Sequence, residues 1–456
     1  MNNSTHKNFV ARSFFVALTI ALTSLAAFAQ QASSNMGPAF MSGTPGTYAI
    51  RGAHVVTVSG ADIENGTVVI SNGKIAAVGA NVSIPSGAHV IEGRGLSVYP
   101  GMIDLGTAMG LIEITEQGAA GWVDTQETGE MNPNSKAFYA INPHSSHIAV
   151  TRVNGVTTVL SSPQGGLISG QSALINLLGS TAPEMALDRF AALVINYPRS
   201  GFGGGGGFFF QPQGAAAGDA ATQRDRQVEQ IRKVLRDAEA YGRALDATNA
   251  DPKLPHPDHD VVLESLVPFA RGQKPVIFRV DRETDIRAAV RFAEEMKLKP
   301  IILGGDDAWK VAPFLKEHNV PVVLTGTMDL PGREDDPYDL RYESAAKVQA
   351  AGAQFAISTG DLAAVVRDLP YNAGMAASFG LPKAEALKAV TLYPAQIIGM
   401  GSQLGSIDVG KIANIVVTDG DLLEARTNIR HLFINGREVP LVSKHTELYD
   451  AFKNRK

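Results

Sequence analysis

The chain has 456 residues, 45% of them apolar and 19% charged, which is typical of a globular protein with one large domain or two smaller ones. Its formal net charge of −5 argues against nucleic-acid binding, which needs a basic surface. The absence of cysteine excludes disulfides, a thiol nucleophile and cysteine-ligated metal.

The first 29 residues have the pattern of a secretory signal peptide. Lys7 and Arg12 precede an apolar run, FFVALTIALTSLAAFA, which is too short to span a bilayer comfortably and ends in a small-x-small cleavage pattern. The alternative is an uncleaved anchor. We expect export with cleavage near Ala29, a periplasmic or secreted protein without a stable membrane span, and a flexible Gly/Pro/Ser-rich leader at 30–46.

Short strand patterns follow at the N-terminal end of the mature chain, over residues 47–97. Asn72-Gly73 lies between two alternating apolar runs and predicts a two-residue hairpin turn. Similar strand patterns return at 402–440, near the C-terminus. We expect the two terminal segments to pair and to form a small composite β-sandwich domain.

Residues 98–401 alternate apolar runs with helical segments. Runs that are apolar throughout are typical of strands buried on both faces of a parallel sheet. Eight such strands are predicted, at 98–107, 155–163, 171–179, 190–198, 274–281, 299–305, 320–327 and 354–361. They favour an α/β fold, a (β/α)8 TIM-like barrel, although the second and third strands leave no room for a full helix between them.

One insertion interrupts this pattern after the fourth strand. Residues 200–221, SGFGGGGGFFFQPQGAAAGDAA, are of low complexity and are predicted to be disordered. They would form either a mobile lid or a tolerated surface loop. A charged helix is predicted next, at about 223–247, with Val228, Ile231, Leu235 and Ala238 on its apolar face.

Motifs along most of the chain resemble the amidohydrolase superfamily, especially its imidazolonepropionase-like branch. They are YPGMID at 99–104, NPHSSHIAVTRVNGVTTVLSSP at 142–163, STGD at 358–361, TLYPAQIIGM at 391–400 and GSIDVGKIANIVVTDGD at 405–421. The resemblance covers nearly everything after residue 47. It implies a barrel with a split sandwich, and hydrolysis of C–N bonds at the C-terminal mouth of the barrel.

The resemblance also implies a metal centre, and here the sequence departs from the family. The family uses two His from the first strand, a Lys or Glu from the fourth, one His each from the fifth and sixth, and an Asp from the eighth to hold a metal that activates water. The matching positions are Gly106 and Ala108, segment 196–199, Arg279, Gly304 and Asp361. Only the last keeps a family ligand, and one carboxylate does not make a divalent site.

We therefore predict no metal ligands and no cofactor. Instead, Arg279 and Asp361 are expected to face each other as a charge pair in the place of the metal, since each aligns with an inward ligand of the resembled family. These two residues and Asp104 are the candidate catalytic residues.

Three further residues are candidates for binding. Asp281 ends the fifth strand, where functional side chains gather in such barrels. Its alternative role is to place a negative charge at the start of the next helix. Tyr371 and Asn372 follow the eighth strand and are expected to line the mouth, with helix packing as the alternative.

Two classes of function stay open. The first is a divergent hydrolase of amide or cyclic amide bonds that works without the standard metal centre. The second is a catalytically inactive relative, either a small-molecule binder or a partner subunit of an active amidohydrolase. A second inward acid beside Asp361, for which Asp104 is the candidate, would favour the enzyme. A closed, satisfied pair of Arg279 and Asp361 would favour the binder. The expected partners are a small-molecule substrate or ligand and a homo- or hetero-oligomer with an amidohydrolase homologue.

Overall fold

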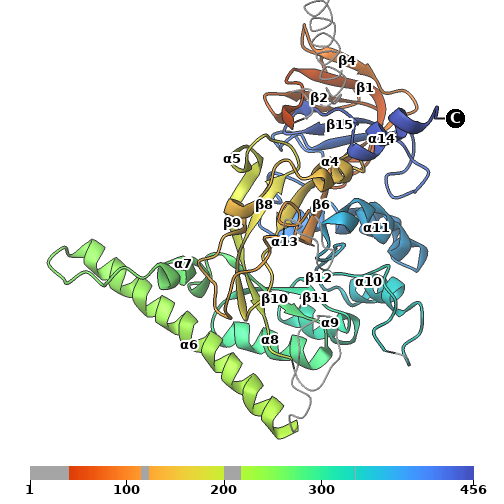
Figure 1. Ribbon diagram of the computed structural model, residues 1–456. Helices are drawn as coiled ribbons and strands as arrows, with labels where there is room; N and C mark the ends of the chain where they lie inside the picture. Colours follow the sequence, from red (N-terminus) through yellow and green to blue (C-terminus); the bar gives the residue numbers. More distant parts are fainter. Residues whose placement is uncertain (1–40, 114–122, 200–216, 334, 456) are drawn as a thin grey trace, which may run out of the picture.

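The computed structural model describes residues 41–113, 123–199, 217–333 and 335–455 (Figure 1). The predicted signal peptide, most of the predicted leader and most of the glycine-rich insertion lie outside these residues. The end of the leader is ordered, because Thr44 pairs with Glu438: its amide donates to the Glu438 carbonyl at 2.8 Å.

Eight strands in the middle of the chain form a nearly closed barrel (Figure 1). In sheet order they are β6 (Met102–Thr107), β7 (Val156–Ser161), β8 (Ile168–Asn176), β9 (Ala186–Asn196), β10 (Pro275–Val280), β11 (Lys299–Gly304), β12 (Val322–Leu324) and β13 (Phe355–Ile357). Each lies within or overlaps one of the eight predicted strands, so the predicted α/β barrel is confirmed.

Two details of the strand predictions are wrong. β8 runs antiparallel to both β7 and β9, because the short link between β7 and β8 allows a hairpin but no crossover. The predicted strand 98–107 is also two strands, which divide at Gly101. A Cβ at Gly101 would lie 2.2 Å from Thr157 Oγ1, so glycine permits the close approach at which the chain passes from one sheet to the other.

Helices cover the outside of the barrel and extend from it (Figure 1). They are α3 (Ala137–Ala140), α4 (Ser146–Arg152), α5 (Ala182–Met185), α6 (Ala217–Ala250), α7 (Val261–Ala270), α8 (Glu283–Glu295), α9 (Ala308–Glu317), α10 (Leu340–Ala351), the 3-10 helix η1 (Ala363–Asp368), α11 (Leu369–Ser378), α12 (Lys383–Ala389), α13 (Leu392–Ile397) and α14 (Lys444–Phe452). Within the described ranges, no helix has the length and apolar character needed to cross a membrane.

Helix α6 is longer than the sequence predicted. It begins at Ala217, so the end of the segment predicted to be disordered is helical, and its alanine-rich sequence favours that extension. Its predicted apolar face is confirmed, since Ile231, Leu235 and Ala238 are fully buried and Val228 is partly buried against the same core. Figure 1 shows α6 and α7 side by side at one flank of the barrel.

The terminal segments form a second, separate sheet, as the sequence predicted. Its strands are β1 (Tyr48–Val55), β2 (Ile63–Ser71), β3 (Lys74–Gly79), β4 (His89–Glu92), β5 (Ser97–Pro100), β14 (Ile415–Thr418), β15 (Ile429–Ile434) and β16 (Arg437–Glu438). The two ends of the chain meet where β5 pairs antiparallel with β14. Asn72 and Gly73 have φ values of 52° and 78°, as a hairpin turn between β2 and β3 requires.

Alternation along the strands separates two apolar cores. Ile277 and Leu303 belong to the cluster that fills the barrel, whereas Phe278 and Ile302 pack in the cluster between strands and helices. Because side chains alternate along a strand, Arg279 points inward, like Ile277, at the C-terminal end of β10. The fold therefore delivers a permanent cation to the mouth of the barrel.

Candidate functional site

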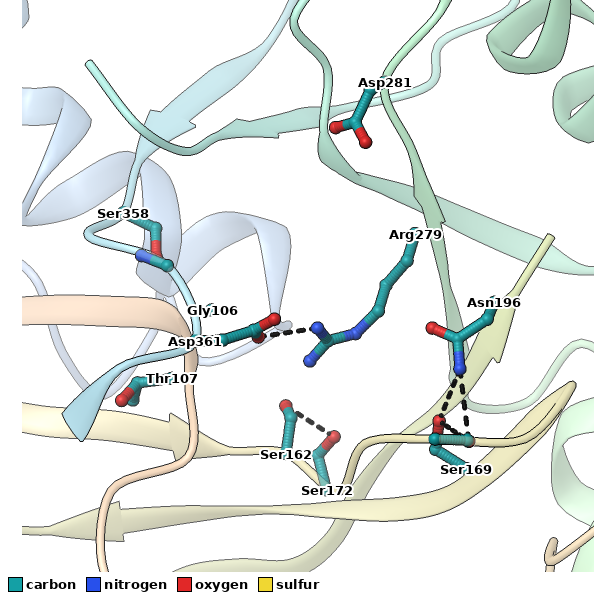
Figure 2. A network of polar contacts seen from close by, with 12 residues as sticks. Gly106, Thr107, Ser162, Ser169, Ser172, Asn196, Arg279, Asp281, Ser358 and Asp361 are labelled. Atoms are coloured by element: carbon teal, nitrogen blue, oxygen red, sulfur yellow. Dashed lines mark hydrogen bonds and ion pairs between the residues drawn. The ribbon is translucent and has the colours of Figure 1, made fainter. Parts of the chain in front are cut away.

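Arg279 and Asp361 form an ion pair in the barrel mouth (Figure 2). Nη1 of Arg279 donates to Oδ1 of Asp361 at 2.6 Å, which confirms the predicted contact. The two partners differ in exposure: the Arg279 side chain is 16% exposed and the Asp361 side chain 48%. The carboxylate therefore reaches the solvent while the guanidinium stays largely within the barrel.

The pair is not a satisfied one. Among the described residues, Nε and Nη2 of Arg279 are buried and have no hydrogen-bond partner. A buried donor without an acceptor is unfavourable, and such groups are rare in folded proteins. The guanidinium is thus hydrogen-bonded on the side of Asp361, while its other edge is unsatisfied. The closed, satisfied pair that would favour a binder is only partly present.

Asp104 holds a different position, at the seam between the first and last strands of the barrel. It accepts four hydrogen bonds: from the amides of Gly106 at 3.0 Å and Thr359 at 3.0 Å, and from the hydroxyls of Thr359 at 2.7 Å and Ser358. Burial raises the pKa of Asp104, although the four donors oppose the shift. Both carboxylate oxygens tie β6 to the segment after β13, and the catalytic role of Asp104 stays a prediction.

The positions that match the resembled family's metal ligands do not fit a metal. A Cβ at Gly106 would lie 2.6 Å from Ser358 Oγ and 2.9 Å from Leu303 Cδ1, so neighbouring side chains already fill that space. A Cβ at Gly304 would lie 2.3 Å from Asp281 Oδ1. Across the described residues, no three His, Cys, Asp or Glu side chains are grouped so that they could hold a metal ion.

Asn196 occupies the position that matches the family's ligand on the fourth strand, and its side-chain amide already makes hydrogen bonds within the protein. Nδ2 of Asn196 donates to the carbonyls of Gly165 at 3.2 Å and Gly166 at 2.7 Å, and it lies 3.0 Å from Ser169 Oγ (Figure 2). Asn196 is the register partner of Arg279 across β9 and β10. The residue beside Arg279 is therefore neutral, and its amide group fixes the loop that leads into β8.

Further charges surround the pair, in alternating signs. Arg199 lies 3.5 Å from Asp281, and Arg341 donates to Asp306 at 2.7 Å. Burial raises the pKa of Asp281, and it raises that of Asp306 to about 6 even though Arg341 acts in the opposite direction. Asp281, predicted as a binding residue, does lie in the mouth, where its carboxylate occupies the space beside Gly304.

Tyr371 and Asn372 are not part of this arrangement, which corrects the expectation that they line the mouth. Both lie in α11. Tyr371 lines a separate cavity of about 250 Å³ with Asn154, Leu422 and other residues from the side of the terminal sheet. Asn372 is buried and donates to the Asp368 carbonyl at 3.0 Å. α11 begins at Leu369, directly after η1, with Pro370 in its first turn.

The sequence reasoning missed the neutral and cationic neighbours of the pair. Ser162 and Ser172 are fully buried, their hydroxyls lie 2.9 Å apart, and Figure 2 shows them facing the Arg279 guanidinium. Position at the end of β7 is a signal that could have indicated Ser162. Arg341, in the first turn of α10, carries no such signal because only the fold brings it to Asp306.

Comparisons with known proteins agree with this architecture. The model of the amidohydrolase family matches residues 310–439. An amidohydrolase from Thermotoga maritima MSB8 shares the fold with a TM-score of 0.74 at 24% identity, covering 86% of this chain and 99% of that one. A search of curated proteins finds no match.

More distant structures share the fold at lower similarity. A prolidase complexed with N-methylphosphonate-L-proline has a TM-score of 0.51 at 17% identity, covering 86% of this chain and 99% of its own. Molinate hydrolase has a TM-score of 0.52 at 17% identity, covering 87% and 95%. At such identities these structures inform the fold and leave the chemistry of the mouth to its own residues.

Proposed function

We propose that the chain is a member of the amidohydrolase superfamily and that it hydrolyses a C–N bond of a small molecule at the barrel mouth without the metal centre of the family. Amides and cyclic amides are the bond class, following the resemblance to the imidazolonepropionase-like branch. The observation that carries the proposal is the ion pair of Arg279 and Asp361 at two of the family's ligand positions.

In this proposal Asp361 performs the proton transfers. Its half-exposed carboxylate accepts a proton from water as the water oxygen bonds to the carbonyl carbon. When the C–N bond breaks, the same proton passes to the leaving nitrogen. Arg279 orients Asp361 through their 2.6 Å hydrogen bond and holds the substrate with its remaining donors.

The test is turnover by protein from which metal has been stripped. Amides and cyclic amides are supplied as substrates, and metal content is measured by elemental analysis. We expect hydrolysis that chelators leave unchanged and that falls at least about 100-fold in Asp361→Asn, which removes the base. Asp329→Asn is the matched control, since Asp329 is an exposed acid near the same mouth. Activity that follows added metal in proportion would contradict the proposal.

A second candidate is a non-catalytic relative. The steric closure at Gly106 and Gly304 favours it, because both positions are filled by packing that leaves no place for the ligands of a water-activating ion. Such a chain would bind a small molecule or act as a partner subunit of an active amidohydrolase. Saturable binding without turnover, or a stable complex with a co-expressed homologue, would support this candidate over the hydrolase.

We also propose that the chain is exported and cleaved near Ala29, which would make it periplasmic or secreted. The order of basic, apolar and small residues in the first 29 positions supports this. The intact mass of protein from its native host tests it: a mature chain that begins close to Gln30 is expected, and one that begins at Met1 would contradict the proposal.

A further inference from the structure

Arg279 has an unused edge in the barrel mouth. Nη1 is taken by Asp361, whereas Nε and Nη2 have no partner among the described residues. We propose that this edge binds a carboxylate group of the ligand, so that the molecules recognised here are small amides that also carry a carboxylate. The inference rests on the proposed function only in taking the barrel mouth as the site, and it holds for a hydrolase or a binder.

The geometry of guanidinium selects a carboxylate. Nε–H and one N–H of Nη2 point in the same direction on one side of the planar group, with a spacing that matches the two oxygens of a carboxylate. A carbonyl oxygen or a chloride ion would satisfy one donor well and the other poorly. Because Asp361 already fixes the opposite side of Arg279, the free edge is held in one orientation before the ligand arrives.

The burial of the two free nitrogens of Arg279 favours a bound group at this edge. Both free nitrogens are shielded from solvent, and a guanidinium donor shielded without an acceptor is unfavourable. A ligand that supplies two acceptors removes this penalty, and the charge-assisted bonds are stronger away from bulk water. A small carboxylate is the simplest group that satisfies both donors together.

The surroundings admit an additional negative charge. The groups that face the guanidinium beyond Asp361 include the neutral hydroxyls of Ser162 and Ser172 (Figure 2). Asp281, another acid of the mouth, is paired with Arg199. Arg199, Arg279 and Arg341 each pair with an aspartate of the mouth, and burial raises the pKa of both Asp281 and Asp306.

Titration with small probes tests the inference on the full protein. Formate, acetate and propionate are titrated by calorimetry and by thermal shift, against acetamide as the neutral analogue and against sodium chloride at equal ionic strength. We expect saturable binding of the carboxylates, at least tenfold tighter than of acetamide. Arg279→Lys keeps a cation for Asp361 and loses the two-donor edge, so it should weaken acetate binding at least tenfold.

Arg199→Lys is the matched control, since Arg199 is an exposed arginine that pairs with an acid at the same mouth, and it should bind acetate as the wild type does. The double variant Arg279→Gln/Asp361→Asn, which removes both charges together, serves if Arg279→Lys does not fold, and it should also lose binding. Equal binding of chloride, equal binding of acetamide, or undiminished binding in Arg279→Lys would each overturn the inference. Hydrolysis of neutral amides without carboxylate binding would overturn it while leaving the proposed function intact.

Discussion

Asp104 is fully buried and Arg279 is largely buried in one barrel, and their surroundings differ completely. Asp104 accepts four hydrogen bonds from the segments it joins, while Arg279 makes one and keeps two buried donors without a partner among the described residues. The first is a structural brace at the seam between β6 and β13. The second is a preformed, incompletely satisfied group at the mouth.

This difference separates residues that support the fold from residues that can bind a ligand within one site. A fully satisfied buried group contributes to the fold and has nothing left with which to bind a ligand. An unsatisfied one destabilises the fold unless something else supplies its partner, so it marks where a ligand belongs. By this criterion, Arg279 is the centre of the candidate site and Asp104 its support.

Asp104→Ala tests the structural side of this contrast and should have the largest effect. It leaves two amides and two hydroxyls without their acceptor at the seam of the barrel, so we expect a loss of about 3–5 kcal/mol in the free energy of unfolding. Chemical denaturation measures the loss. Asp104→Asn, which keeps one acceptor oxygen, should fall between this variant and the wild type. A stable Asp104→Ala protein that only loses ligand binding would reverse the roles assigned to the two residues.

A double-mutant cycle on Arg279 and Asp361 tests the other half of the comparison, the group at the barrel mouth. Asp361→Asn leaves the buried cation without its counter-charge and should cost about 2–3 kcal/mol. Arg279→Met should cost about 1 kcal/mol, because the half-exposed Asp361 turns to water instead. Denaturant midpoints of both single variants and the double variant give the coupling energy. Additive losses would mean that the two side chains do not interact in solution.

Gly106→Ala measures how tightly the barrel packs around a position that matches a metal ligand of the resembled family. The new methyl group would press on Ser358 Oγ and Leu303 Cδ1, and we expect a loss of about 1–2 kcal/mol in the free energy of unfolding. Gly60→Ala is the control, because a Cβ there meets only Thr57 Oγ1, at 3.8 Å. A neutral Gly106→Ala would show that the barrel can reopen this position to a larger side chain.

The sequence predicted the parts of this molecule that follow from periodicity and from the resemblance. Uninterrupted apolar runs indicated the eight barrel strands, and alternation along β10 brought Arg279 inward to face Asp361. The direction of β8 was missed because an apolar run looks the same in either orientation. Only the short link before it carried information about the turn.

The surroundings of the pair depend on contacts between distant parts of the chain, which a single sequence does not encode locally. Three of the four hydrogen bonds to Asp104 come from Ser358 and Thr359, more than 250 positions away, so its role at the seam had no local signal. Tyr371 and Asn372 follow the eighth strand as functional residues often do, but the rotation of α11 decided where they point. Position along the chain therefore predicted which charged residues lie in the site, but it did not predict the contacts around them.

Asp306 is intermediate between the fully hydrogen-bonded Asp104 and the partly unsatisfied Arg279. Its substitution should have the smallest effect on stability. It has one strong partner, Arg341, at 2.7 Å, yet burial raises its pKa to about 6. A carboxyl group whose pKa is higher in the folded than in the unfolded state stabilises the fold only while it is protonated. Below the unfolded pKa near 4 the two states bind the proton equally, and between about pH 4 and pH 6 the unfolded chain releases its proton first. Wild-type stability should therefore fall, relative to Asp306→Asn, as the pH rises through this window.

Because Asp306 is partly exposed and solvent screens its charge, the change in that difference should not exceed about 1 kcal/mol between pH 4.5 and pH 7.5. Urea denaturation of both proteins at the two pH values measures it, and Asp329→Asn, at an exposed neighbouring acid, is the control that should show no such dependence. A difference that grows in the opposite direction would mean that Arg341 outweighs burial at Asp306. The mouth would then be more negative at neutral pH than the paired charges indicate, and less suited to a carboxylate on Arg279.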